Sequence, residues 1–542
     1  MKRHLSYCNI ALAGLGLANS TMQASPVSRK PNIIFIITDD MQKYMCNFLP
    51  EGKGKNLTPN LDRLAAEGTV MLGQHVSSTV CTPSRFSCLT GMYASRARNS
   101  MFLRGQKRFP DVTMIGWNSF ILPQTPTLPK LLRKLGYVTG AVGKNHVIEC
   151  PQIRKVPYTA DPRDPKVVAT LKKNQEMLIQ AYQQAGFDYA SHLYDHNPDN
   201  NGPRALAVHN MDWIMEGACE FIERYAGRPF FLYLATTIPH GPMEPKRSWK
   251  ADRRLTPVGI LDSPLTLLPS AESIEERLRQ AGLPADRNTG NMLWLDDALG
   301  LLLKRLRERK VLDNTIIFFF NDHGQLAKGT IYQGGTSDPS VVWRKGGFPC
   351  GHTSRALVSN IDFAPTILEI AGGDPDKVSH FDGKSFWPVL LGKKQKVHDY
   401  LYFEIGFTRG IRVGDWKYLA LRYPQKAMQM SLTQRKRVLD NFNRRMKLHG
   451  KRTFTEDPSR PFSHVSLIPG GGGAEHASYE KYPAYHEADQ LYNLAQDPNE
   501  QHNLARDPNY AGKLKEMQRI LRSVLRQLPG NFAEFTAPSR GQ

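Results

Sequence analysis

Two acidic corners of the chain have the residue types of a site for a divalent metal ion. Asp39 and Asp40 directly follow one short apolar run, and Asp322 and His323 closely follow another. Adjacent carboxylates repel each other and are costly to bury unless a cation compensates their charge. Three carboxylates offer hard oxygen ligands, which suit Ca²⁺ or Mg²⁺ better than Zn²⁺ and do not choose between the first two. For either corner taken alone, an exposed acidic turn is the alternative interpretation.

Basic and imidazole side chains follow two further apolar runs and the second acidic corner. Lys144 and His146 stand in Gly-Lys-Asn-His, His240 stands in Pro-His-Gly-Pro, and Lys328 stands in Lys-Gly-Thr. Taken singly, each is more often structural or solvated than catalytic. Ligands of open parallel sheets bind beyond the carboxyl ends of the strands, so these repeated positions predict one shared site for a metal ion and an anion.

A cysteine motif adds a different kind of chemistry. Cys81-Thr82-Pro83-Ser84-Arg85 matches Cys-x-Pro-x-Arg, the sequence at which a cysteine is oxidised to formylglycine. The hydrated aldehyde is a geminal diol, in which one oxygen can attack sulfur and the other can expel the product. Five residues also recur by chance, and a cysteine before a Pro-Ser turn is often a small buried hydrophobe. The pentapeptide by itself therefore does not decide the function.

Together these motifs resemble those of the type I, formylglycine-dependent sulfatases in the alkaline-phosphatase-like superfamily. Asn145 stands where that family has tryptophan, Gln333 stands where it has glutamate, and the family's Arg-Val-Pro is missing from 336–339. None of these departures removes a lysine or histidine of the expected site. The likeness runs from residue 30 to residue 505. It includes four further landmark segments, which are Thr58–Asp62, Asn360–Thr366, Asp415–Tyr418 and Leu491–Leu494.

The resemblance implies a sulfuric ester hydrolase that depends on formylglycine and on one divalent cation, Ca²⁺ more readily than Mg²⁺. A maturation enzyme would convert Cys81 to formylglycine (3-oxoalanine). The metal ligands that the resemblance implies are Asp39, Asp40, the modified Cys81, Asp322 and His323. The catalytic residues that it implies are Cys81, Arg85, Lys144, His146, His240 and Lys328.

The resemblance also implies a role for each catalytic side chain. Arg85 would hold the formylglycine hydroxyl by charge-assisted hydrogen bonds. Lys144, His240 and Lys328 would neutralise the sulfate oxygens in the transition state, and His240 or Lys328 would protonate the departing alcohol oxygen. His146 would then take the proton from the second hydroxyl, so that sulfate leaves.

The charge of the chain bears on the substrate. The formal net charge is +21, and basic residues cluster in the segment 433–452. A field of this sign attracts polyanions, but none of the known nucleic-acid-binding motifs is present, so nucleic acid is not an expected partner. We expect a sulfated small molecule or glycan, most readily a sulfated carbohydrate, selected by loops 96–128 and 151–205 and by the basic segment. A solvated basic face without a specific partner is the alternative.

Four other functions compete with this prediction. An arylsulfatase would act on small aryl sulfates, and a formylglycine-using phosphodiesterase or phosphonate hydrolase would share both acidic corners. Lys144 and Lys328 do not exclude a phosphate ester. A zinc-based phosphatase fits less well, because it requires a second metal ion and more histidines. A non-catalytic polyanion-binding protein would keep an unmodified Cys81.

The elements that must position the site alternate between strands and helices. Short β-branched or aromatic runs predict buried strands, and apolar residues at helical spacing predict helices between them, such as the one from Trp294 to Leu306. The predicted strands are 32–37, 137–142, 230–235 and 315–320. This alternation predicts an α/β catalytic domain from 30 to 392, with a large, mostly parallel sheet between two layers of helices.

The rest of the chain has shorter patterns. Residues 393–542 predict a smaller α+β domain, in which 400–404 and 411–421 form an antiparallel sheet and 513–528 form a closing amphipathic helix. Residues 151–200 are rich in proline, aspartate and asparagine and predict an irregular insertion.

The N-terminus and the cysteines bear on the compartment. Residues 1–24 have a basic start and a short apolar stretch, which predict an export signal and a periplasmic or secreted protein. No apolar run reaches the roughly 18 residues that span a bilayer, so stable membrane insertion is not expected. Besides Cys8 and Cys81, five cysteines remain, which allow two disulfides that the sequence does not assign.

Overall fold

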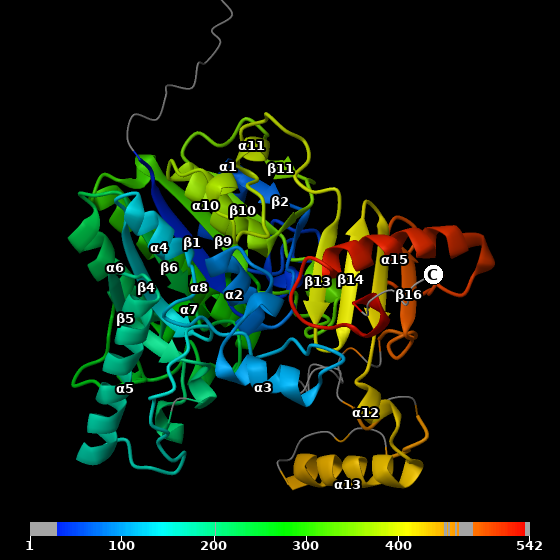
Figure 1. Cartoon of the computed structure of the whole chain (residues 1–542). Coiled ribbons are helices and arrows are strands. Elements are labelled where there is room, and N and C mark those ends of the chain that lie inside the picture. Colours follow the sequence, from blue (N-terminus) through cyan, green and yellow to red (C-terminus); the bar gives the residue numbers. More distant parts are fainter. Residues whose placement is uncertain are drawn as a thin grey trace, which may run out of the picture.

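A computed structural model describes residues 30–200, 202–448, 453, 456–460, 463–465, 478 and 481–536. The predicted export signal and residues 449–452 of the basic segment lie outside the described residues. Figure 1 shows a large part with a central sheet covered by helices, and a smaller part with its own sheet and the helix α15. Among the described residues, no helix has both the length and the apolar character needed to cross a membrane.

The large sheet is mostly parallel, as predicted. Its strand order is β11-β2-β10-β9-β1-β6-β4-β5. The five strands from β9 to β5 run parallel to one another, whereas β10 is antiparallel to both β9 and β2. The parallel strands are β9 (Thr315–Asn321), β1 (Asn32–Thr38), β6 (Phe230–Ala235), β4 (Val138–Asn145) and β5 (Tyr189–Asp195). The others are β10 (Ser340–Arg344), β2 (Thr69–Met71) and β11 (Thr353–Ser354).

The central strands are apolar throughout because helices cover both faces of the sheet. In β1, Ile34 and Ile36 face one hydrophobic core, whereas Ile33, Phe35 and Ile37 face a second one. The first core is completed by α1 (Pro59–Glu67), α6 (Met211–Tyr225), α7 (Ala271–Gln280) and α8 (Arg287–Glu308). The second is completed by α2 (Cys81–Thr90), α3 (Ser100–Arg108), α4 (Leu128–Lys134), α5 (Pro165–Gln184) and α10 (Phe363–Ile370).

The expectation of an irregular segment at 151–200 is wrong. This segment contains α5 and β5, the edge strand of the large sheet. Its prolines and aspartates begin the helix instead of preventing it, since Asp164 caps the first turn through the Lys166 N–H and Pro165 occupies the first helical position. Leu171, Leu178 and Tyr182 form the buried face of α5.

The smaller sheet is antiparallel, as predicted, and its order is β13-β14-β15-β16. Its strands are β13 (Leu401–Ile405), β14 (Thr408–Val413), β15 (Trp416–Leu421) and β16 (Asp489–Asn493). The helix α15 (Ala511–Leu525) packs on this sheet. The same hydrophobic core includes Val80 and Ile331 of the large part, so the small sheet supports the segments that carry Cys81 and Lys328.

Several short elements complete the described fold. They are α9 (Gln333–Thr336), α11 (Trp387–Leu390), α12 (Gln425–Met428), β3 (Gln74–His75), β12 (Val358–Ser359), β7 (Leu255–Thr256) and β8 (Gly259–Ile260). Much of the basic segment forms α13 (Leu432–Leu448), which lies at the lower edge of the molecule in Figure 1. The six cysteines within the described residues are all free thiols, so no disulfide joins them.

Candidate active site

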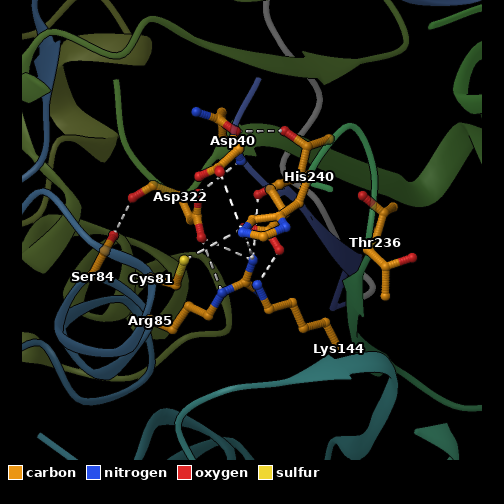
Figure 2. Close-up of polar contacts among 12 residues, drawn as sticks. Asp40, Cys81, Ser84, Arg85, Lys144, Thr236, His240 and Asp322 are labelled. Atoms are coloured by element: carbon orange, nitrogen blue, oxygen red, sulfur yellow. Dashed lines mark hydrogen bonds and ion pairs between the residues drawn. The ribbon is translucent and has the colours of Figure 1, made fainter. Parts of the chain in front are cut away.

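The carboxyl ends of four neighbouring parallel strands bring the predicted residues together (Figure 2). Asp39 and Asp40 follow β1, Asp322 follows β9, Lys144 lies near the end of β4, and His240 follows β6. This is the edge at which ligands bind in open parallel sheets. The polar residues that end the four predicted strands therefore share one site.

An asparagine at the end of β9 holds the two acidic corners against each other. Thr38 and Asn321 are partners in the register of β1 and β9. Asn321 Oδ1 accepts hydrogen bonds from the Met41 N–H at 2.9 Å and from the Thr38 hydroxyl at 3.1 Å. Between them, Asp40 has φ of 60°, a left-handed conformation that is uncommon outside glycine. The bonds of Asn321 thus help to fix a strained backbone that turns Asp40 toward the site.

The acidic corners and His323 form a cluster with the composition of a metal site. One ligand atom from each of Asp40, Cys81, Asp322 and His323 lies within 4.8 Å of every other. His323 Nε2 is 3.2 Å from Asp40 Oδ1 and 3.4 Å from Asp322 Oδ1. Asp39, Asp40 and His240 form a second such group. Carboxylate oxygens from three aspartates fit a hard divalent cation, as the sequence predicted.

Cys81 is the first residue of α2, and its side chain points into this cluster (Figure 2). Its sulfur lies 3.5 Å from Asp39 Oδ1 and 3.6 Å from His323 Nε2. The side chain is buried, and burial raises the pKa of the thiol, with a further contribution from the negative charge of Asp322. An unmodified Cys81 is therefore a neutral thiol near pH 7, which is a poor nucleophile.

Arg85 lies one turn after Cys81 on the same face of α2. Its Nη2 and Nε atoms donate to Asp322 Oδ2 at 3.1 and 3.3 Å, and Nη2 lies 3.7 Å from Asp39 Oδ1. The guanidinium is fully buried, so these carboxylates compensate its charge. Arg85 thereby fixes the orientation of carboxylates from both acidic corners.

Two lysines and a histidine also contact the carboxylates of the first acidic corner. Lys144 forms a buried ion pair with Asp39. Lys328 Nζ lies 2.6 Å from Asp40 Oδ1, and His240 Nε2 lies 3.3 Å from Asp40 Oδ2. Burial raises the pKa of Asp39, but Lys144 and His240 outweigh that effect and hold it well below the ordinary value. Asp39 is therefore ionised at neutral pH.

His146 lies beyond the end of β4 and makes fewer contacts. Its ring centroid is 5.0 Å from that of His196, and no hydrogen bond within the described residues joins it to Cys81. Burial lowers the pKa of His146 well below its ordinary value, and the nearby charge of Lys144 adds to this effect. The imidazole is therefore neutral near pH 7 and has a free lone pair that can accept a proton.

Asn145 stands where the sulfatase-like motif would have a tryptophan, and it holds the turn that carries His146 through hydrogen bonds. Its Oδ1 accepts hydrogen bonds from the N–H groups of Val147 and Ile148, at 3.2 and 2.9 Å. Its Nδ2 donates to the Ile148 carbonyl at 3.1 Å and to Asp195 Oδ1 at 3.2 Å. These bonds close the turn that carries His146 and join it to the end of β5.

Three residues of the site cannot be identified as site residues from the sequence, although Asn360 begins one of the family landmark segments. Asn197 Nδ2 lies 3.0 Å from His240 Nε2, and His196 packs on His146, so the segment after β5 forms one wall of the site. Asn360 Oδ1 accepts from the Ser77 N–H at 2.9 Å, and its Nδ2 donates to Ser84 Oγ at 2.9 Å, which anchors α2. The polar residues His196 and Asn197 are the available signal, but they indicate a site only once β5 is known to end just before them.

Comparison with known proteins places this site in a family. The family model described as Sulfatase matches residues 31–373, which is more than half of the chain. The model described as N-sulphoglucosamine sulphohydrolase, C-terminal, matches residues 321–436. The first match includes every predicted metal-binding and catalytic residue.

Several curated proteins align with most of the chain. N-acetylgalactosamine-6-sulfatase from Canis lupus familiaris is 25% identical over 430 residues, which cover 75% of this chain and 74% of that protein. Arylsulfatase G from Homo sapiens is 28% identical, with 72% and 75% covered. An ulvan-active sulfatase from Formosa agariphila is 25% identical, with 80% and 74% covered.

Solved structures share the fold. The structure of a protein in complex with its substrate D-glucosamine-2-N,6-O-disulfate has a TM-score of 0.56 at 20% identity, covering 92% of this chain and 98% of that one. A phosphonate monoester hydrolase from Silicibacter pomeroyi has a TM-score of 0.54 at 16% identity, covering 92% and 96%. At such identities the likeness shows a common architecture of a large parallel sheet and a small antiparallel sheet.

Proposed function

The chain belongs to the sulfatase family, and from this premise we propose that it removes sulfate from a sulfated carbohydrate with a formylglycine at position 81 and a bound Ca²⁺. As a sulfatase it is a hydrolase of sulfate esters. The observation that carries the proposal is the position of Cys81 at the start of α2. Its sulfur lies within 3.6 Å of Asp39 and His323, where a hydrated aldehyde would meet both a metal ion and a sulfate group.

Asp39, Asp40, Asp322 and His323 would hold the cation together with residue 81. Asp39 and Asp322 are fully buried, and Arg85 contacts both of them and helps to set their orientation. When bound, the cation supplies positive charge that lowers the pKa of a hydroxyl beside it. The donor set fits Ca²⁺ and Mg²⁺ alike, and the preference for Ca²⁺ rests on the resemblance to the family.

The conversion of Cys81 would be the work of a maturation enzyme. A formylglycine there supplies two geminal hydroxyls, one to attack sulfur and one to release the product. Lys144 and Lys328 would neutralise the sulfate oxygens from the positions in which they contact Asp39 and Asp40. Arg85, which contacts both acidic corners, would hold the hydroxyl of residue 81.

Two histidines would move the protons. His240 lies at the open side of the cluster, 3.3 Å from Asp40, and would protonate the departing alcohol oxygen, with Lys328 as the alternative donor. His146 would take the proton from the second hydroxyl, and its lowered pKa keeps it available as a base at neutral pH. His196 packs against His146 and limits how far its ring can turn.

A sulfated carbohydrate is the substrate class that the comparisons support best. The names of two relatives specify an N-acetylgalactosamine sulfate and ulvan, and one structural neighbour holds a glucosamine disulfate. Arylsulfatase G supports the aryl sulfate alternative at a similar level of identity. Phosphonate monoester hydrolase supports the phosphonate alternative only through its fold, at 16% identity.

The domain boundary and the compartment are also part of the proposal. We place the catalytic domain at 30–392 and the smaller domain at 393–542, since β13 begins the second sheet at Leu401. Export to the periplasm or the medium would bring the enzyme to a polysaccharide.

The test is to measure activity and modification on the same preparation. Protein purified from its native host should release sulfate from sulfated mono- or oligosaccharides faster than from matched phosphate or phosphonate esters. Mass spectrometry should find formylglycine in the peptide that contains residue 81, and metal analysis should find one divalent ion per chain. Active enzyme with an ordinary Cys81 thiol would refute the formylglycine proposal, and faster phosphonate hydrolysis would favour the alternative activity.

A further inference from the structure

A cavity of about 780 Å³ lies next to the active site, between α5, the start of α3 and the segments that follow β4 and β5. Its wall includes Asp195 and His196 on the side of the active site, and Leu171, Asn174 and Leu178 of α5 on the other side. The rim is formed by α3 and by the segment 148–158.

His196 separates this cavity from the catalytic groups. One face of its ring lines the cavity, and the ring also packs on His146 with centroids 5.0 Å apart. The next residue, Asn197, lies 3.0 Å from His240 Nε2. A single side chain therefore separates the cavity from a substrate bound at residue 81. The cavity lies behind His146 and His240, the two histidines assigned to proton transfer.

Glu149 and Arg104 both line the cavity and their charges offset each other, so the remaining unpaired charge at the rim is positive. Asp199 pairs with Arg247, and Asp195 pairs with His196 at 3.2 Å, so these acids of the wall are compensated. Arg154 and Lys155 are exposed and form no ion pair with any described residue. Their side chains are free to meet an anionic ligand.

The segment that carries these two basic residues is held in a defined position. Asn174 of α5 accepts from the Arg154 N–H at 2.9 Å and donates to the Arg154 carbonyl at 2.8 Å. The Tyr158 carbonyl accepts from the Arg204 N–H at 2.9 Å. The two charges are therefore presented by an anchored backbone instead of a free loop.

The same rim offers apolar surface suited to a sugar ring. Tyr158 and Met101 line the cavity and are 44% and 46% exposed, so both side chains are accessible to a ligand. Exposed aromatic and apolar groups beside a few polar ones are typical of ligand sites. A flat, partly apolar ring that carries a negative group would contact both kinds of side chain at once.

We propose that this cavity binds a second sugar of the substrate, and that Arg154 and Lys155 contact an anionic group on that sugar. The inference rests on the proposed function and extends it, because it specifies a charged oligosaccharide as the substrate. A sulfate ester and a uronate carboxylate have the anionic chemistry that these two side chains recognise. The scissile sulfate lies at residue 81, and the second sugar is bound but not cleaved.

The test compares substrates that differ only in the second sugar. Full-length enzyme with modified Cys81 would be assayed on a sulfated monosaccharide and on three oligosaccharides, whose second sugar is sulfated, a uronate or uncharged. Each exposed ion pair contributes a factor of up to about five in affinity, so Arg154→Gln with Lys155→Gln should raise KM by about tenfold for one or both charged oligosaccharides. The charged oligosaccharide whose KM rises identifies the anionic group that the two side chains bind. KM for the monosaccharide should change less than twofold.

Lys166→Gln with Lys172→Gln is the matched control, because it removes two exposed charges of α5 that do not line the cavity. It should leave all KM values within about twofold, since surface charges far from a ligand are screened. An equal KM rise for charged and uncharged oligosaccharides, or no rise for either charged one, would overturn the inference and leave the sulfatase activity intact. Failure of the unaltered enzyme to release sulfate from all four substrates would instead overturn the proposed function.

Discussion

Lys417→Met should destabilise the protein by about 3–5 kcal/mol, because it leaves the carboxylate of Glu500 buried without its cation. Lys417 Nζ lies 2.9 Å from Glu500 Oε1, and both side chains are fully buried. Burial raises the pKa of Glu500 even with Lys417 beside it, and burial lowers the pKa of Lys417 to about 8. Both directions show that burial disfavours each charge, so the attraction between the two groups is needed to keep both of them ionised.

The same substitution should lower activity, although Lys417 is remote from the predicted catalytic groups in the sequence. Glu500 Oε2 accepts a 2.5 Å hydrogen bond from the N–H of Gln333, the first residue of α9. Gln333 follows Lys328 by five residues, so the ion pair helps to position the segment that presents Lys328 to Asp40. A displacement of about 1 Å in such a group can lower kcat/KM by about 100-fold.

Urea unfolding followed by tryptophan fluorescence and initial rates of sulfate release would measure both effects. The double variant Lys417→Met with Glu500→Gln should lose less stability than the sum of the single variants, because no unpaired charge remains and the glutamine can still accept from Gln333. Lys513→Met is the matched control, since Lys513 pairs with Glu516 at the surface and should cost less than about 1 kcal/mol. A loss below about 1 kcal/mol for Lys417→Met, or strict additivity in the double variant, would refute the reasoning.

Four further predictions concern the reaction. Cys81→Ala should abolish turnover in sulfate-release assays. Cys81→Ser should stop after about one turnover, since a serine ester has no second hydroxyl to expel the product. Sustained turnover by either variant would show another nucleophile. Lys328→Met should lower kcat/KM by about 100- to 1,000-fold, because the positive charge that stabilises the transition state is lost. Lys345→Met, which removes an exposed ion pair with Asp313, is the control and should leave kcat/KM unchanged. Equal kcat/KM values for the two variants would exclude Lys328 from the site. A lowered pKa keeps the imidazole of His146 unprotonated at pH values where an ordinary histidine gains a proton. Activity should therefore be retained as pH falls through 6.5 and be lost only well below it. A loss of activity centred near pH 6.5 that disappears in His146→Gln would contradict this prediction. Removal of the metal ion by a chelator should abolish sulfate release, and added Ca²⁺ should restore more activity than Mg²⁺; full activity in protein shown by analysis to be metal-free would exclude the metal site.

The strand-end residues could be predicted because their signals are local. The run Ile33–Ile37 is apolar at every position, which indicates a strand covered on both faces, and the acidic pair follows it at once. The same pattern located the end of β9 and the residues Asp322 and His323. The family likeness then connected these ends, since each motif appears in the expected order along the chain.

The helix α5 and the strand β5 could not be predicted, because neither has a comparably clear local pattern. Proline and aspartate at 162–165 read as a loop, although in the structure they cap and begin a helix. His192 and Asp195 make β5 too polar to be recognised as a buried edge strand. As a result the wall formed by His196 and Asn197 was missed, and with it the cavity beside the active site.

The amino-acid sequence by itself determined which chemical groups the protein has, their order along the chain and the strand ends that carry them. Only the tertiary structure decided which of them touch. Asp39 pairs with Lys144 across 105 residues, Asp40 pairs with Lys328 across 288, and Glu500 meets Gln333 across 167. Such contacts depend on the order β9-β1-β6-β4 and on the packing of the small sheet against the large part. Local propensity and hydrophobic period describe neighbours along the chain and carry no information about that order.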